Sequence, residues 1–309
     1  MAAAVLVSNE VDDRVGHEYL SAVPGLKIVE YDPNELTLTE VQRSSDLLMP
    51  PYRGSHRPLG LIAELPNLRM VQLLSAGVDE WRPHVPNHVT VASARGAHAG
   101  PVSEWVLSAI LTQLRQWPAL VRFQDEHVWA HRRFNADTLA GSRVLILGAG
   151  SIGMAVARKL QAFDATATLV ASTARPGFHG PEELPQLVTG HSVVVVTAPL
   201  TERTFRLVDT NFLAAMDDGA LLVNAGRGQI VDTDALVVEL DSGRLRAALD
   251  VTDPEPLPAD HSLWRHQAAI ISPHAARTVP GTNRLCYEVA AEQIQAFLSG
   301  DTPSNVAHA

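Results

Sequence analysis

Three side chains with complementary chemistry each follow a short apolar run in the C-terminal half of the chain. Arg227 stands in a Gly-rich turn, Glu255 lies between two prolines, and His274 follows Ser-Pro. Arginine binds a planar anion through two parallel hydrogen bonds, and histidine transfers protons near neutral pH. A carboxylate beside the histidine favours the imidazolium. Hydride transfer to or from a 2-hydroxy acid needs these groups, which makes the three residues catalytic candidates.

Taken alone, each candidate has a plainer interpretation. Arg227 would be a surface residue, Glu255 an acid in a stiff loop and His274 a capped turn residue. Their shared position just past predicted strands favours a site, because the carboxyl ends of parallel strands face the ligand crevice of an open α/β sheet.

A nucleotide-binding turn is predicted between a strand and a helix. Val144 to Leu147 is an unbroken apolar run, typical of a strand buried on both faces. Gly148, Gly150 and Gly153 follow as G-x-G-x-x-G, and the next residues have a helical pattern. The glycines allow a tight turn, close approach of a pyrophosphate and helix packing on the strand. An ordinary Gly-rich turn is the alternative, but the flanking pattern favours the nucleotide site.

The elements that must position these residues form two α/β groups. Six strands separated by helix-sized gaps predict a Rossmann-type doubly wound parallel sheet; they are expected at 144–147, 168–170, 192–197, 220–224, 247–250 and 269–271. Five earlier runs predict a smaller flavodoxin-like α/β domain; they cover 5–7, 28–31, 47–49, 71–74 and 89–92. After the fourth run, free amides at Ala76 and Gly77 are expected to hold a carboxylate, although an ordinary βα loop would look the same.

A turn-rich hinge at 95–101 separates the two groups, and a helix is expected to begin with Pro101 at its first position. Apolar residues from Val102 to Leu114 predict that this helix is buried against the dinucleotide domain or a second subunit. The following segment, 117–138, carries Trp129 and the paired Arg132-Arg133 and is interpreted as an exposed connection at a subunit interface.

The composition of the chain limits the functions that can be expected of it. The 309 residues, 46% hydrophobic, suit about two domains with a core each. A formal charge of −10 argues against a nucleic-acid partner. The single cysteine excludes an intramolecular disulfide and fits a reducing cytoplasm. Neither a signal peptide nor a run of membrane-spanning length is expected, and His98, His127 and His131 lack metal-ligand spacing, so no metal is predicted.

From about Val71 to about Leu285, the ordered motifs resemble the D-isomer-specific 2-hydroxyacid dehydrogenase family, which includes glyoxylate/hydroxypyruvate reductases. The resemblance implies that Arg227, Glu255 and His274 are the catalytic residues. It implies substrate contacts from Ser75, Ala76, Gly77, Arg227 and His274. It implies cofactor contacts from Gly148, Gly150, Ser151, Ile152, Gly153, Ala198, Pro199, Ala225 and Asp250.

The resemblance also implies that the chain crosses between domains twice. Residues 1–96 would form the first part of the substrate domain, 97–280 the dinucleotide-binding domain, and 281–309 a C-terminal helix returning to the substrate domain. It implies reduction of a small 2-oxo acid to a D-2-hydroxy acid by a cytoplasmic homodimer. The alternative is a cofactor-sensing, corepressor-like interaction protein on the same fold.

Two positions depart from the family pattern. Thr252 replaces a usual aromatic residue, which leaves the size of the substrate open. Ala171 stands where NAD-dependent members usually have an acid that binds the adenine ribose. Without that acid, Ser172 and Thr173 can donate hydrogen bonds to a 2′-phosphate and Arg175 can supply charge. NADP is therefore the expected cofactor; if Arg175 is only a solvated loop residue, NAD is possible too.

Overall fold

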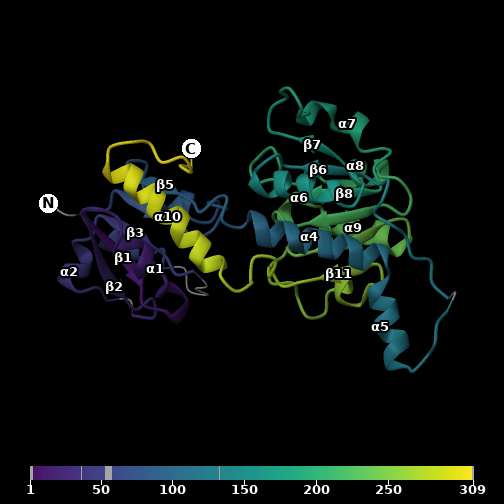
Figure 1. The fold of residues 1–309 in the computed structure, drawn as a ribbon, viewed down its shortest axis with the longest axis horizontal. Helices are drawn as coiled ribbons and strands as arrows, with labels where there is room; N and C mark the ends of the chain where they lie inside the picture. The colour runs from purple at the N-terminus through teal and green to yellow at the C-terminus, as the bar shows by residue number, and fades with distance from the viewer. Residues whose placement is uncertain (1–2, 36, 53–57, 132, 308–309) are drawn as a thin grey trace. The chain divides into compact units, whose positions relative to one another are not determined.

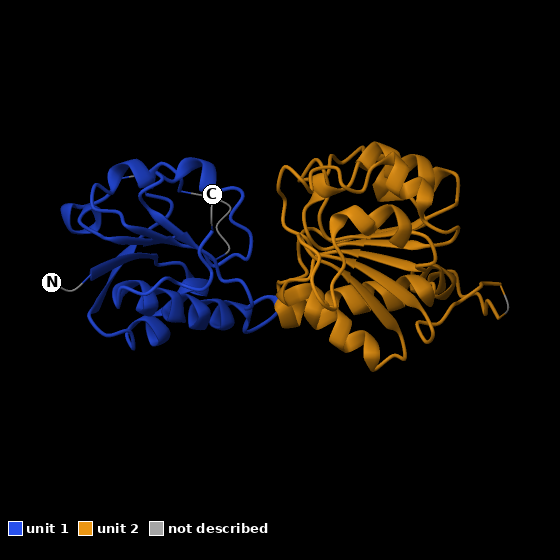
Figure 2. Ribbon diagram, turned by 90° about the horizontal axis from the view of Figure 1, so that it is seen from above, with its two compact units in different colours: residues 1–98, 279–309 blue, residues 99–278 orange. Residues whose placement is uncertain are grey.

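The computed structural model describes residues 3–35, 37–52, 58–131 and 133–307, and the chain divides into two compact units. Unit 1 comprises residues 1–98 and 279–309, and unit 2 comprises 99–278 (Figure 2). The sequence placed the crossings after 96 and 280. Within the described ranges, no helix has both the length and the apolar character needed to cross a membrane.

Unit 1 contains a five-stranded parallel sheet (Figure 1). The strands are β1 (Ala3–Ser8), β2 (Leu26–Tyr31), β3 (Leu47–Met49), β4 (Met70–Gln72) and β5 (Thr90–Ala92). The helices are α1 (Gly16–Leu20), α2 (Glu40–Arg43), α3 (Leu61–Glu64) and α10 (Thr282–Leu298), with 3₁₀ turns η1 (Val11–Asp13) and η2 (Arg82–His84). The spatial order β2-β1-β3-β4-β5 confirms the flavodoxin-like prediction.

Unit 2 contains a six-stranded parallel sheet. The strands are β6 (Arg143–Leu147), β7 (Thr166–Val170), β8 (Val193–Val196), β9 (Leu221–Asn224), β10 (Arg246–Leu249) and β11 (Ala269–Ile271). The helices are α4 (Ala99–Leu114), α5 (Trp117–Asp125), α6 (Ser151–Gln161), α7 (Leu184–Leu187), α8 (Thr210–Ala215) and α9 (Thr233–Asp241), with 3₁₀ turns η3 (Pro181–Glu183), η4 (Gly228–Ile230) and η5 (Ser262–Arg265). The spatial order of the strands is β11-β10-β9-β8-β6-β7. The chain therefore builds the sheet outward from β6 first on one side and then on the other, which confirms the doubly wound sheet.

Continuous apolar runs form these strands because both faces of each sheet are covered by helices (Figure 2). In β6, Leu145 and Leu147 belong to one hydrophobic core, whereas Val144 and Ile146 belong to another. Successive strand residues point to opposite faces, so Val144 to Leu147 are all buried. The polar groups that could do chemistry are thereby confined to the strand ends and the loops.

The segment after the hinge differs from the prediction in two places. Helix α4 begins at Ala99, two residues before Pro101; Pro101 still falls in the first turn, where its missing N–H costs no helical hydrogen bond. The buried residues of α4 pack within unit 2, against α6, β9 and β10. Within the expected exposed connection, residues from Trp117 to Asp125 form helix α5, and no residue of α5 is buried. Arg132 lies outside the described residues.

Candidate active site

The three candidate catalytic residues follow three neighbouring strands of the unit 2 sheet. Arg227 follows β9 and precedes η4, Glu255 follows β10, and His274 follows β11. These strands are adjacent and parallel, so their carboxyl ends lie along one edge of the sheet.

His274 and Glu255 are in direct contact. The distance from His274 Nδ1 to Glu255 Oε1 is 2.7 Å, and each side chain is about two-fifths exposed, at 39% and 40%. Partial burial raises the pKa of the Glu255 carboxyl. The hydrogen bond and charge of His274, the Thr252 backbone N–H and the charge of Arg227 outweigh that effect and lower the pKa below its ordinary value. Glu255 is therefore a carboxylate at neutral pH, and its contact with Nδ1 leaves Nε2 of His274 for a reacting oxygen.

Asp250 holds the loop that carries His274. Its carboxylate Oδ1 accepts hydrogen bonds from Ser272 Oγ at 2.6 Å and from the backbone N–H groups of Ala275 and Ala276 at 2.8 and 3.0 Å. The Asp250 backbone carbonyl accepts the N–H of His274 at 2.8 Å. His274 has a left-handed φ of 51°, which an L-residue rarely adopts without such support. Asp250, predicted to bind the cofactor, thus also fixes the histidine loop.

Asn224 plays a comparable part for Arg227. Its side chain is buried, its Nδ2 donates to the Arg227 carbonyl at 2.9 Å, and its Oδ1 accepts the Gly226 N–H at 3.0 Å. Gly228 allows a close approach to the segment before Glu255, because a Cβ there would lie 1.9 Å from the Thr252 carbonyl oxygen. The two loops therefore pack directly on each other.

No role for Asn224 or Ser272 was predicted from the sequence. Each is a small polar residue at the end of an apolar strand, Asn224 as the last residue of β9 and Ser272 directly after β11. That position is the sequence signal that could have identified them.

The glycines before α6 fit a nucleotide pyrophosphate. Gly148 has φ 119°, and a Cβ there would lie 2.6 Å from the Ala198 N atom. A Cβ on Gly153 would lie 1.9 Å from the Gly148 carbonyl oxygen, whereas a Cβ on Gly150 would meet nothing within 4 Å. Gly148 and Gly153 are thus required by packing, and Gly150 leaves open space at the N-terminus of α6, where Ser151 and Ile152 begin the helix.

The remaining predicted contacts lie at other strand ends. In unit 2, Ala198 and Pro199 follow β8, and Ala225 follows β9. In unit 1, Ser75, Ala76 and Gly77 follow β4, and Ser75 Oγ donates to the Gly77 carbonyl at 2.7 Å. Their contact with a substrate stays a prediction. No group of three His, Cys, Asp or Glu side chains suited to a metal ion occurs in the part of the chain that the structure describes.

Beyond β7, the positions predicted to select the cofactor form an exposed loop. Ala171 is buried, whereas Ser172, Thr173 and Arg175 are exposed. No carboxylate replaces the missing acid at position 171, and no ion pair to Arg175 is found among the described residues.

Comparisons with known proteins agree on one family. The family model described as "D-isomer specific 2-hydroxyacid dehydrogenase, NAD binding domain" matches residues 107–276. A glyoxylate reductase of Thermofilum pendens is 30% identical over 253 residues, which cover 77% of this chain and 74% of that protein. Glyoxylate/hydroxypyruvate reductase A HPR2 of Arabidopsis thaliana is 27% identical and covers 87% of each chain. The structure of a D-isomer specific 2-hydroxyacid dehydrogenase from Xanthobacter autotrophicus, solved with NADPH and MES, has a TM-score of 0.84 and 29% identity, and covers 99% of this chain and 98% of that one.

Proposed function

Because the chain belongs to the D-isomer specific 2-hydroxyacid dehydrogenase family and is an NAD(P)-dependent oxidoreductase, we propose that it reduces small 2-oxo acids of the glyoxylate or hydroxypyruvate type. The observation that carries the proposal is the 2.7 Å contact of His274 with Glu255, on a sheet edge that also carries Arg227. The relatives named as glyoxylate or hydroxypyruvate reductases support the substrate class.

In the proposed mechanism, each side chain has one task. A bound nicotinamide cofactor supplies the hydride. Arg227 binds the substrate carboxylate and stabilises negative charge that develops on the carbonyl oxygen. His274 donates a proton from Nε2 to that oxygen, and Glu255 orients the imidazolium through Nδ1 and stabilises its charge. In the oxidation direction, His274 accepts the same proton.

The activity is tested by following absorbance at 340 nm with NADPH or NADH and a panel of 2-oxo acids that includes glyoxylate, hydroxypyruvate and pyruvate. We expect turnover with the smallest acids. Absence of turnover with every acid and both cofactors would contradict the proposal and favour a cofactor-sensing interaction protein.

We further propose that NADP(H) is the preferred cofactor. Support comes from Ala171 in place of an acid and from the exposed Ser172, Thr173 and Arg175 after it; the similar Xanthobacter protein was solved with NADPH. The kcat/KM values for NADPH and NADH, measured in the wild type and in Arg175→Ala, test this. A wild-type preference for NADH would contradict it.

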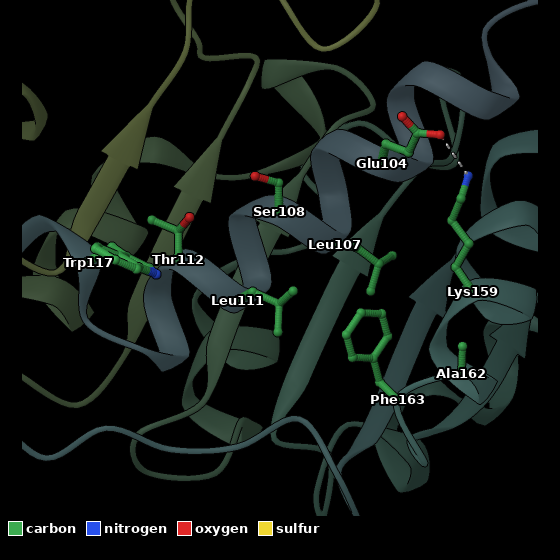
Figure 3. Close-up of a pocket in the computed structure, with 9 residues that line it drawn as sticks. All are labelled: Glu104, Leu107, Ser108, Leu111, Thr112, Trp117, Lys159, Ala162 and Phe163. Atoms are coloured by element: carbon green, nitrogen blue, oxygen red, sulfur yellow. Dashed lines mark ion pairs between the residues drawn. The ribbon is translucent and has the colours of Figure 1, made fainter.

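A homodimer is proposed from an apolar hollow on unit 2 (Figure 3). Leu107 and Leu111 of α4 and Phe163 beyond α6 line it, and Trp117 lies at its other end. Phe163 is 39% and Trp117 55% exposed, and Trp129, beyond α5, is 92% exposed. Apolar side chains that α4 and α5 leave uncovered are typical of a subunit interface.

Light scattering at micromolar concentration tests the dimer. We expect a dimer for the wild type and dissociation for Phe163→Glu, with Val238→Glu as a control because Val238 is exposed on α9, outside the hollow. A monomeric wild type would contradict this proposal.

Cys286, the single cysteine, supports a cytoplasmic location, which we also propose.

A further inference from the structure

A two-residue turn in the loop after β7 brings Arg175 and Phe178 together. The N–H of Arg175 donates to the Phe178 carbonyl at 3.1 Å, and the N–H of Phe178 donates to the Arg175 carbonyl at 2.8 Å. Pro176 and Gly177 occupy the two central positions, and Gly177 has φ 84°, which matches a turn with proline second and glycine third. Residues that exchange both backbone hydrogen bonds place their side chains on the same face.

The Arg175 guanidinium consequently lies over the Phe178 ring, with Cζ 4.2 Å from the ring centre. A guanidinium over an aromatic face is attracted by the ring, and its planar fork of N–H groups can still bind an anion. Phe178 is half-buried and Arg175 is exposed. The ring thus restricts a long side chain that would otherwise lose more conformational freedom when it binds.

The return arm of the loop is anchored on the sheet. The N–H of Ala171 donates to the His179 carbonyl and the N–H of His179 to the Leu169 carbonyl, each at 2.9 Å. Glu183 accepts the Gly180 N–H at 2.8 Å and contacts His179 Nδ1 at 2.7 Å. Phe178 is therefore a fixed platform rather than a side chain on a free loop.

We propose that Phe178 is a positioning residue that holds the Arg175 guanidinium ready for the 2′-phosphate of adenosine. This role rests on the proposed preference for NADP(H). Phe178 does not itself touch the phosphate; it selects the 2′-phosphorylated nucleotide by lowering the cost of ordering Arg175.

Titration calorimetry on the full chain measures the binding of 2′,5′-ADP and of 5′-AMP. The difference between the two affinities gives the contribution of the 2′-phosphate. We expect Phe178→Ala to weaken 2′,5′-ADP binding by about three- to tenfold, with 5′-AMP binding unchanged and Phe178→Tyr close to the wild type. In steady state, KM for NADPH should rise by the same factor while KM for NADH and kcat stay constant. Phe205→Ala is a matched control, because Phe205 is exposed and carries the Arg206 guanidinium at 5.8 Å, outside the β7 loop.

The NADP(H) preference and the positioning role of Phe178 would be contradicted by different results. If the wild type binds 5′-AMP as tightly as 2′,5′-ADP, the NADP(H) preference is wrong, and the role of Phe178 with it. If the wild type prefers 2′,5′-ADP but Phe178→Ala keeps that preference, or loses affinity for both nucleotides equally, only the positioning role is overturned. Unchanged far-ultraviolet circular dichroism in Phe178→Ala excludes misfolding as the cause of a selective loss.

Discussion

At the scale of single residues, the ionisation of Glu255 sets what His274 can do. The partly buried carboxylate has a lowered pKa because His274, the Thr252 N–H and Arg227 stabilise its charge more than burial opposes it. A carboxylate with a lowered pKa remains ionised throughout the range in which histidine titrates. It can therefore stabilise the imidazolium that the proposed reduction needs.

Glu255→Gln should keep the shape of the pair but shift the pH profile of reduction towards acid, because the imidazolium loses its anionic partner. The pH dependence of kcat/KM with a 2-oxo acid measures the shift. Glu30→Gln is a matched control, since Glu30 pairs with His17 at 2.9 Å in unit 1. A wild-type profile for Glu255→Gln would show that Glu255 does not tune His274.

Arg227→Ala should raise KM for the 2-oxo acid and lower kcat, with kcat/KM reduced by about 100-fold or more, because one cation both binds the carboxylate and stabilises the developing charge. Arg227→Lys should restore only part of the loss, since lysine lacks the bidentate geometry. Steady-state kinetics measure the effect. Arg206→Ala is the control, because it removes an exposed arginine that is paired with Asp232. A change confined to KM would remove Arg227 from the chemical step.

At the scale of the elements, three neighbouring parallel strands end in the loops of the candidate site, and a buried polar side chain holds two of these loops. Asn224 holds the Arg227 loop, and Asp250 holds the His274 loop through both its carbonyl and its carboxylate. These contacts replace the regular hydrogen bonds that the backbone loses where a strand ends. They also maintain the left-handed backbone of His274.

Ser272→Ala removes the hydroxyl that donates to Asp250 at 2.6 Å. Loss of a hydrogen bond to a charged group costs about 1.5 kcal/mol, so a loosened His274 loop should lower kcat by up to roughly tenfold. Ser272→Thr should restore the rate, as stopped-flow and steady-state measurements can show. If Ser272→Ala lowers only the melting temperature, the hydrogen bond supports the fold and not the histidine.

At the scale of the whole molecule, each unit has hydrophobic cores on both faces of its own sheet. The C-terminal segment belongs to unit 1, where α10 packs on α1 and β4, and the Ala307 N–H donates to the Val91 carbonyl. Stability therefore depends on groups buried in both sheets, including polar ones far from the candidate site. His191 is such a group in unit 2: it is fully buried, and its Nε2 lies 2.9 Å from Thr168 Oγ1 on β7.

Burial, helped by the charge of Arg143, lowers the pKa of His191 below its ordinary value of 6.5 despite opposing backbone hydrogen bonds. The folded state keeps this histidine neutral while the unfolded chain binds a proton, so its stabilising contribution is complete above pH 6.5 and is lost as the pH falls below it. Urea unfolding at pH 7.5 and 5.5 should show a smaller pH dependence for His191→Gln than for the wild type. Exposed His131→Gln is the control, and an equal pH dependence in all three proteins would contradict the assignment.

Local patterns in the sequence were sufficient to predict the strands of both sheets and the nucleotide-binding turn. Every strand was expected within a few residues of its place, because strands covered on both faces are mostly apolar. The G-x-G-x-x-G spacing likewise predicts a turn in which Gly148 has a positive φ and Gly153 packs where a side chain would not fit. Helix α5 was missed although Trp117, Leu120 and Val121 recur in it at helical spacing.

Contacts between loops were decided by the tertiary structure alone. His274 and Glu255 are separated by 19 residues, and Asp250 and Ala275 by 25; they meet because β10 and β11 are neighbours in the sheet. The sequence shows which residues follow each strand, but the distance between two strand ends depends on strand order and on close approaches such as that of Gly228 to Thr252. For that reason the chemical groups were predictable from the sequence, whereas the contact by which Asp250 holds the His274 loop required the folded chain.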